Sequence, residues 1–190
     1  METVDPALVA RARDGDVEAF GELFRATHRR IYNFVRHMVM NPEDAADLTQ
    51  RAYVSAWRGL KALRANAAFL VWLHRVALNA VRDARKRPVR PTVSLDAMAD
   101  DDDGPPGGDV PDWSRGPAEI ALSKDTQAVV RRAVCSLPEI HRSVVTMHHL
   151  EEMPVDDIAA VLDISRGTVL SRLARAREAL HRKLGRFLNE

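Results

Sequence analysis

A stretch near the middle of the chain has the composition of a linker, and it limits what the rest can fold into. Residues 88–117 hold six of the ten prolines and four of the nine glycines, without helical or strand periodicity. They carry seven aspartates against two arginines, a net charge of −5. Proline and glycine at this density interrupt regular structure. We therefore expect two folded units, residues 1–87 and 118–190, joined by a flexible acidic linker.

The first unit has the periodicity of amphipathic helices. In residues 17–38 apolar side chains alternate steps of three and four, which predicts one long helix with a packed face. Asn41 followed by Pro42 matches an N-cap and a first helical residue, so a second helix should begin there. The predicted packing residues are Val17, Phe20, Phe24, Thr27, Ile31, Phe34 and Met38 in the first helix, and Leu48, Ala52, Tyr53, Ala56 and Trp57 in the second.

Two polar stripes follow from the same spacing. Asp47, Arg51, Val54 and Arg58 share the outer side of the second helix. In a third helix, "AAFLVWLHRVALNAVRDARKR", Phe69, Leu73, Val76 and Ala80 face inward. The polar stripe opposite them is able to follow a phosphate backbone, although a stripe of this kind taken alone is more often a solvated face. Its members are Arg75, Asn79, Arg82 and Lys86.

The second unit ends in a strongly basic helix. Residues 165–186 hold seven basic residues and one acidic residue, a net charge of +6, whereas the whole chain carries +1. Val169, Leu173, Ala176, Leu180 and Leu184 form a packing face, and Ser165 is a suitable N-cap. A shorter helix beginning near Pro154 precedes it. The pair has the pattern of a helix-turn-helix, whose second helix enters the DNA major groove, and a plain helical hairpin remains the alternative.

The sequence disfavours membrane proteins, secreted proteins, disulfide-bonded proteins and metalloproteins. No apolar run approaches the roughly 18 residues of a membrane span, and the polar N-terminus is unlike a signal peptide, so we expect a cytoplasmic protein without membrane insertion. The single cysteine, Cys135, excludes an internal disulfide and is expected to be a small buried hydrophobe. His148 and His149 are adjacent on a helix and cannot readily share a metal ion. We predict no enzyme activity, no cofactor and no metal site.

Four strings in order resemble the extracytoplasmic-function (ECF) sigma factors of the bacterial sigma-70 family. They are "AFGELFRATHRRIYNFVRHMV", "DAADLTQRAYVSAWRGL", "FLVWLHRVALNAVRDARKR" and "LPEIHRSVVTMHHLEEMPVDDIAAVLDISRGTVLSRLARAREAL". The resemblance implies an all-α protein of two small helical domains, a sigma domain 2 bundle over 1–87 and a sigma domain 4 helix-turn-helix over 118–190, joined by the 88–117 linker. It implies a sigma factor that directs transcription initiation at particular promoters.

The resemblance also implies partners and site residues. The partners are core RNA polymerase, through its beta and beta-prime subunits, promoter DNA, and an anti-sigma factor. The implied polymerase contacts are Asp44, Asp47, Gln50, Val54 and Arg58. The implied −10 DNA contacts are Arg64, Asn66, Arg75, Asn79, Arg82 and Lys86. The implied −35 DNA contacts are Arg166, Thr168, Ser171, Arg172 and Arg175.

Two positions depart from the family pattern, and one segment has an additional reading. Arg51 follows Gln50 where an acidic residue is usual, so one of the polymerase contacts implied by the resemblance is in doubt. Leu170 stands where a basic residue is usual, which suggests an altered −35 contact. Residues 100–103 are four aspartates, which either mimic nucleic acid inside the polymerase or belong to a solvated tether.

The sequence is less consistent with two rival functions. A stand-alone helix-turn-helix regulator would use residues 1–87 for sensing or dimerisation, and the basic stripe from Arg75 to Arg82 argues against it. A metal-dependent helical enzyme would need paired ligands, which the "HHLEE" segment does not supply.

Overall fold

The computed structural model describes residues 4–86 and 128–187, and these residues form helices and turns without any strand. The predicted all-α fold class is confirmed. The 88–117 linker, with its aspartate run, lies outside the described residues. We call residues 4–86 the N-terminal unit and residues 128–187 the C-terminal unit.

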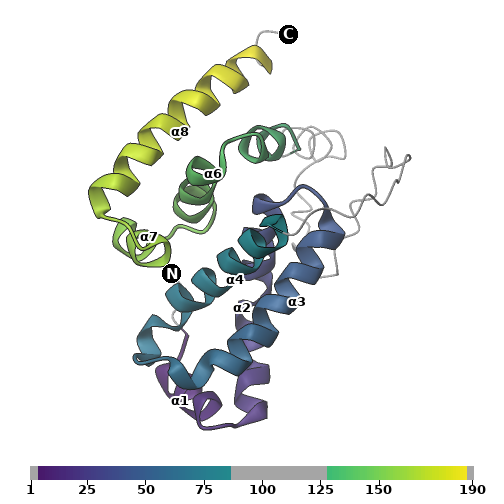
Figure 1. Ribbon diagram of the computed structural model, residues 1–190, viewed down its shortest axis with the longest axis vertical. Coiled ribbons are helices and arrows are strands. Elements are labelled where there is room, and N and C mark those ends of the chain that lie inside the picture. Colours follow the sequence, from purple (N-terminus) through teal and green to yellow (C-terminus); the bar gives the residue numbers. More distant parts are fainter. Residues whose placement is uncertain (1–3, 87–127, 188–190) are drawn as a thin grey trace, which may run out of the picture.

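The N-terminal unit is a bundle of four helices with two short helical turns (Figure 1). Helix α4 packs against both α2 and α3, and α1 packs against α2. The turns η1 and η2 connect α3 to α4 and lie near α1. The elements are α1 (Pro6–Arg13), α2 (Val17–Met38), α3 (Pro42–Gly59), η1 (Leu60–Ala62), η2 (Asn66–Ala68) and α4 (Phe69–Lys86).

Side-chain caps fix where the first three helices begin. Asp5 accepts from the Ala7 amide at 2.8 Å, and Asp16 accepts from the Ala19 amide at 3.0 Å. Asn41 accepts from the Glu43 amide at 2.7 Å, which confirms the predicted N-cap. These acceptors satisfy amides that have no partner within the helix.

The predicted packing faces are correct except at one end of the α2–α3 contact. Val17 is 71% exposed, and Phe24 and Trp57 are each 37% exposed, although helical periodicity predicts all three on packing faces. Leu23 and Ala19 are buried instead. The apolar stripe of α2 is wider than its contact with the bundle, so periodicity alone did not show which apolar residues stay uncovered.

The C-terminal unit contains the predicted helix-turn-helix. A helix over 128–135 is followed by α6 (Glu139–Val145), the π-helical turn η3 (Thr146–Leu150), α7 (Val155–Leu162) and α8 (Arg166–Phe187). Asp163 ends α7 in the left-handed conformation, with φ of 55°. The Ser165 hydroxyl accepts from the Thr168 amide at 3.2 Å and caps α8. Val169, Leu173 and Ala176 are buried, as predicted.

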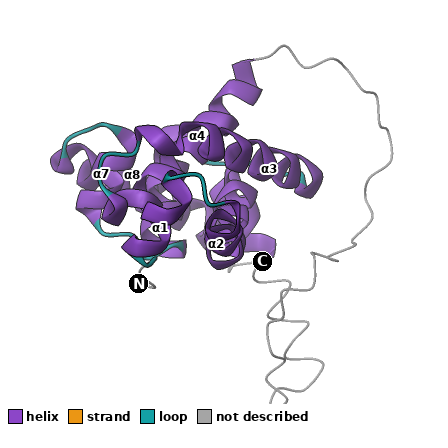
Figure 2. Cartoon of the chain, turned by 90° about the horizontal axis from the view of Figure 1, so that it is seen from below, coloured by secondary structure: helices purple, strands orange, loops and turns teal. Residues whose placement is uncertain are grey.

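The two units pack directly on each other, which their sequence patterns do not predict. Helix α4 contacts α7, and α2 contacts both α6 and η3. Buried apolar side chains of the two units form one continuous cluster. Both views place α7 beside α4 (Figures 1 and 2). In this structure the units therefore form one compact assembly rather than two bodies held only by a linker.

A buried histidine in α4 predicts acid sensitivity of this fold. His74 is fully buried and its Nδ1 lies 2.8 Å from the Leu70 carbonyl oxygen. Burial lowers the pKa of His74 from 6.5 to about 4, and Arg30 adds to the decrease. Because the unfolded chain takes up the proton first, this contribution to stability is present above pH 6.5 and is lost as pH falls towards 4.

We expect the free energy of unfolding of the wild type to fall by up to about 3 kcal/mol more than that of His74→Gln between pH 7 and pH 4. Urea unfolding across this range measures the difference, with the exposed His181→Gln as the matched control. Parallel pH profiles for the wild type and His74→Gln would contradict the assignment.

Candidate nucleic-acid and partner interfaces

The outer face of α3 is an uncovered stripe. Asp44, Asp47, Gln50, Val54 and Arg58 are all exposed, so the five predicted polymerase contacts are accessible. Val54, at 45% exposed, is an apolar residue among polar ones. Arg51 pairs with Asp47, with Nη2 to Oδ2 at 2.8 Å. The residue that departs from the family pattern thus neutralises a predicted contact residue on the same face.

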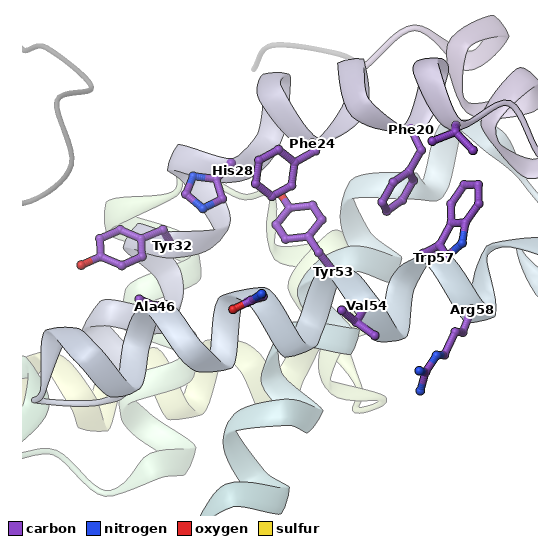
Figure 3. A pocket seen from close by; sticks show the side chains of 11 residues that line it. Phe20, Phe24, His28, Tyr32, Ala46, Tyr53, Val54, Trp57 and Arg58 are labelled. Carbon is purple, nitrogen blue, oxygen red and sulfur yellow. The ribbon is translucent and has the colours of Figure 1, made fainter.

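An aromatic groove lies beside this stripe, between α2 and α3. Its volume is about 770 Å³, and Val54 and Arg58 form part of its wall (Figure 3). The Phe20 and Trp57 ring centroids are 4.9 Å apart, and those of Phe24 and Tyr53 are 4.7 Å apart. Because the rings of Phe24 and Trp57 line this open groove, they are partly exposed, and the predicted packing face is too wide here. Exposed apolar surface of this kind next to charged residues is typical of a protein-binding site.

The polar stripe on α4 is divided by the packing of the two units. Asn79 and Lys86 are exposed. Arg75 donates from Nε to the Val161 carbonyl at 3.3 Å, and from Nη2 to the Ala160 carbonyl. Both carbonyls lie at the C-terminal end of α7, where helix carbonyls lack intrahelical donors and attract cations. Of the four members of the predicted stripe, Asn79 and Lys86 are therefore open, whereas Arg75, although exposed, is bonded to the other unit.

Glu139, the first residue of α6, binds the next arginines of α4. Its two carboxylate oxygens accept from Arg82 Nε and Arg85 Nη1, each at 2.9 Å. Burial alone would raise the pKa of Glu139, but the two arginines lower it overall. The carboxylate is therefore ionised at neutral pH and holds both guanidinium groups.

A second ion pair crosses the interface at η3. Arg30 donates from Nε to the Glu151 carboxylate at 3.0 Å and from Nη2 to the Glu151 backbone carbonyl at 2.7 Å. The π-helical turn before Glu151, followed by Glu152 with φ of 51°, brings this side chain into the interface. Burial raises the pKa of Glu151 to about 7, and Arg30 offsets only part of that increase.

The carboxyl end of α2 completes the interface. The Met38 carbonyl accepts from Arg142 of the C-terminal unit and from Arg85 of its own unit, each at 2.7 Å. The thiol of Cys135 donates to the His37 carbonyl at 3.4 Å. Cys135 is 5% exposed, which confirms the prediction of a buried residue. Its burial depends partly on the other unit.

The loop before α4 holds the remaining predicted −10 residues. Arg64 is exposed. Asn66 is half-buried at the start of η2, and its amide oxygen accepts from Arg13 Nη1 at 3.1 Å. Arg64 is therefore accessible to a ligand, whereas Asn66 is fixed by α1.

Helix α8 presents its predicted −35 residues near its N-terminal end. Arg166 lies 3.4 Å from Asp156, and the Ser171 hydroxyl donates to the Thr168 carbonyl at 3.0 Å. Arg175 is exposed and Arg172 is half-buried. Leu170, the second departure from the family pattern, is 49% exposed. The geometry suits a helix that inserts into a groove, because basic residues extend along the side opposite Val169 and Leu173.

The residues that sequence analysis missed are those that join the two units: Arg30, Glu151, Glu139, Arg85 and Arg142. Arg30 and Glu151 are 121 positions apart, and Arg82 and Glu139 are 57 apart. No spacing rule connects such positions, since local periodicity reports only which face of one helix a residue shares.

Among the described residues, no group of three or more His, Cys, Asp or Glu side chains is placed to hold a metal ion. The helices of residues 4–86 and 128–187 include none that is both long and apolar enough to cross a membrane.

Comparisons with known proteins indicate the same protein family for both units. Residues 23–90 match the sequence family described as Sigma-70 region 2, and residues 127–180 match Sigma-70, region 4. The chain is 33% identical over 187 residues to the ECF RNA polymerase sigma-E factor of Escherichia coli K12, covering 96% of this chain and 95% of that protein. It is 31% identical over 186 residues to the RNA polymerase sigma-H factor of Pseudomonas aeruginosa, covering 98% and 96%.

A solved structure of similar fold supports the same grouping. It is that of CnrH in complex with the cytosolic domain of CnrY, with a TM-score of 0.68 and 25% identity, covering 95% of this chain and 97% of CnrH. A Bartonella quintana sigma factor RpoE, solved in complex with the anti-sigma factor NepR, has the same fold, with a TM-score of 0.64 and 18% identity over 89% of this chain and 98% of that one.

Proposed function

The chain belongs to the ECF sigma factors of the bacterial sigma-70 family, and we propose that it divides the work of a sigma factor among three surfaces. The exposed face of α3 binds core RNA polymerase, α4 with its preceding loop binds −10 DNA, and α8 binds −35 DNA. The near full-length match to sigma-E and sigma-H factors carries this proposal. Residues 1–87 and 118–190 are then the two binding domains, and 88–117 is the linker.

The α3 surface suits a protein partner better than DNA. Its exposed residues mix both charges with Val54, and the aromatic groove adjoins it. Apolar contacts supply affinity and flanking charges supply orientation in such interfaces. We assign Asp44, Asp47, Gln50, Val54 and Arg58 to core polymerase, in contact with its beta and beta-prime subunits.

The α4 surface and α8 have complementary tasks on DNA. Opening the duplex requires unstacking bases, which costs a few kcal/mol each, and a basic surface that holds the single strand offsets this cost. Arg64, Asn66, Arg75, Asn79, Arg82 and Lys86 form this surface. The N-terminal half of α8 reads the −35 duplex through Arg166, Thr168, Ser171, Arg172 and Arg175, since side chains there reach base edges in a major groove. Binding energy drives the process, without an enzymatic step of the sigma factor.

An anti-sigma factor is the proposed regulator. The Bartonella quintana sigma factor RpoE, which has the same fold, was solved in complex with the anti-sigma factor NepR, and this supports a partner of that kind for this chain. The exposed groove between α2 and α3 is a suitable surface. Because polymerase and promoter DNA are in the bacterial cytoplasm, we place the protein there.

Transcription in vitro tests the function as a whole. Purified core polymerase with this protein should initiate at discrete positions on genomic fragments, and core alone should not. Mapped start sites would identify the promoter elements. Failure of the wild-type protein to bind core polymerase would contradict the function, and would revive the alternative of a stand-alone helix-turn-helix regulator, which the full-length match does not favour.

For the recognition helix, we expect Arg172→Ala and Arg175→Ala each to lower transcription from −35-dependent promoters about tenfold, since one good contact to DNA contributes about 1–3 kcal/mol. Core affinity should be unchanged. Arg182→Ala, further along the same helix, is the matched control. An equal loss on promoters without a −35 element would contradict the assignment.

A further inference from the structure

The outer face of α8 carries a stripe without polar side chains near its N-terminal end. Helix α8 packs against α6 and α7 at the edge of the molecule (Figure 1). Gly167, Leu170 and Ala174 follow at steps of three and four, so they share one side of the helix, and all three are exposed. Leu170 is 49% exposed and lies about 100° around the helix from the buried Val169. We call these three exposed residues the apolar stripe of α8.

Packing within the protein does not account for the stripe. A Cβ atom added at Gly167 would lie 3.9 Å from the Ser165 hydroxyl oxygen, an ordinary van der Waals contact, so the fold does not require glycine there. A single exposed leucine is common on protein surfaces. Leu170, however, is on the helix that the proposed function places in the major groove, where DNA would remove its side chain from water. Because Gly167 and Ala174 are small, base edges can approach Leu170 closely.

The polar side chains next to the stripe are bonded within the protein. The Ser165 and Thr168 hydroxyl oxygens are 2.8 Å apart, and the Ser171 hydroxyl donates to the Thr168 carbonyl at 3.0 Å. The Arg166 guanidinium lies 3.4 Å from the Asp156 carboxylate. Base contacts by these polar groups compete with the bonds that they already make. An apolar contact by Leu170 disturbs none of them.

A leucine side chain selects one base in the major groove. All four bases present hydrogen-bonding groups there, and thymine alone also presents an apolar group, its C5-methyl. Leucine packed against an amino group or a ring nitrogen would leave that group without a hydrogen bond, which is unfavourable. Leucine packed against the thymine methyl group removes apolar surface of both partners from water. An A·T pair carries this methyl group, whereas a G·C pair does not.

We propose that Leu170 is a specificity-determining residue, which contacts the C5-methyl group of a thymine in the −35 element while Ala174 extends the apolar contact. The inference rests on the proposed −35 role of α8. Leu170 stands where the family pattern has a basic residue, which would bind phosphate or guanine instead. At this position a methyl contact therefore replaces a charged contact, and the −35 element of this protein contains a thymine that faces Leu170.

Replacement of thymine by uracil tests this contact alone, because uracil differs from thymine only by the missing methyl group. The protein is the full chain in preassembled holoenzyme, and the DNA is a promoter whose start site has been mapped by transcription. Each thymine of its −35 element, on either strand, is replaced in turn by deoxyuridine. Competition against a fluorescein-labelled promoter measures the affinity. The variants are Leu170→Ala, Leu170→Arg and, as the matched control, Ile140→Ala, since Ile140 on α6 is also 49% exposed.

We expect the wild type to lose about fourfold in affinity at one of these thymines, the effect of removing one methyl group from an apolar contact. Leu170→Ala should be nearly insensitive to the same replacement, because alanine does not reach the methyl group. Ile140→Ala should respond as the wild type does. Leu170→Arg should lose the thymine preference and gain a phosphate contact, which makes the slope of log affinity against log salt steeper by about 0.9.

Three results would overturn the inference: wild-type affinity that is unchanged at every replaced thymine, an equal loss of affinity in Leu170→Ala, or a −35 element without thymine on either strand. In each case transcription from the mapped start site would leave the sigma-factor function intact. Failure of the wild-type holoenzyme to initiate at any position would contradict that function, and the thymine contact with it.

Discussion

The double substitution Asp47→Arg with Val54→Glu should lower affinity for core RNA polymerase by about 100-fold, which corresponds to about 2.7 kcal/mol. Val54 is 45% exposed and surrounded by polar residues on the free face of α3. A carboxylate at this position would be desolvated by the partner without an opposite charge. The arginine at position 47 would reverse a charge that orients the complex and would stand beside Arg51.

The fold should tolerate both changes. Asp47 is 53% exposed and forms an exposed ion pair with Arg51, and such pairs contribute at most about 1 kcal/mol. Fluorescence titration with labelled core measures the affinity. Asp14→Arg, an equal charge reversal after α1 where the side chain is 78% exposed, is the matched control. If the double variant binds core polymerase as tightly as the wild type does, the outer face of α3 is not the polymerase-binding surface.

Alanine at Arg75, Asn79 and Arg82 together should reduce the yield of open promoter complexes by about 10- to 100-fold while core affinity stays unchanged. The three side chains lie on one stripe of α4 and would hold the melted strand. Each lost phosphate contact should also make the salt dependence of opening shallower, by about 0.7 in the logarithmic slope for single-stranded DNA.

This experiment must be made on preassembled holoenzyme. Arg75 and Arg82 also hold the two units together, so their removal would favour separation in the free protein and oppose the loss of DNA contacts. Permanganate footprinting measures strand opening, and Lys61→Ala in η1 is the matched control. Unchanged opening by a folded triple variant would show that α4 does not hold the promoter.

The fold class and the order of the helices were predictable because they depend on local chemistry. Asn41 and Ser165 cap α3 and α8 as their side chains predict. The buried face of α8, from Val169 to Ala176, follows from a spacing of three and four residues. Each of these signals lies within one or two helical turns, where sequence neighbours are also spatial neighbours.

The membership of each apolar face was less predictable. Phe24 and Trp57 satisfy the same periodicity as Phe34 and Ala56, but they line an open groove whereas the latter are buried. Periodicity gives the direction of a side chain from its own helix axis. Whether another element covers it depends on how the helices cross, which is decided by packing of the whole bundle.

The two helical units, and the stripes of polar residues that suit polymerase and DNA, follow from local sequence patterns. Which of those residues are accessible depends instead on how the helices pack in three dimensions. Asn79 and Arg82 share one stripe, but Asn79 is exposed whereas Arg82 is held by a carboxylate 57 positions away. Charge and helical spacing are local properties, whereas ion pairs such as Arg30 with Glu151 exist only after two distant surfaces dock, because an ion pair requires proximity in space and not in sequence.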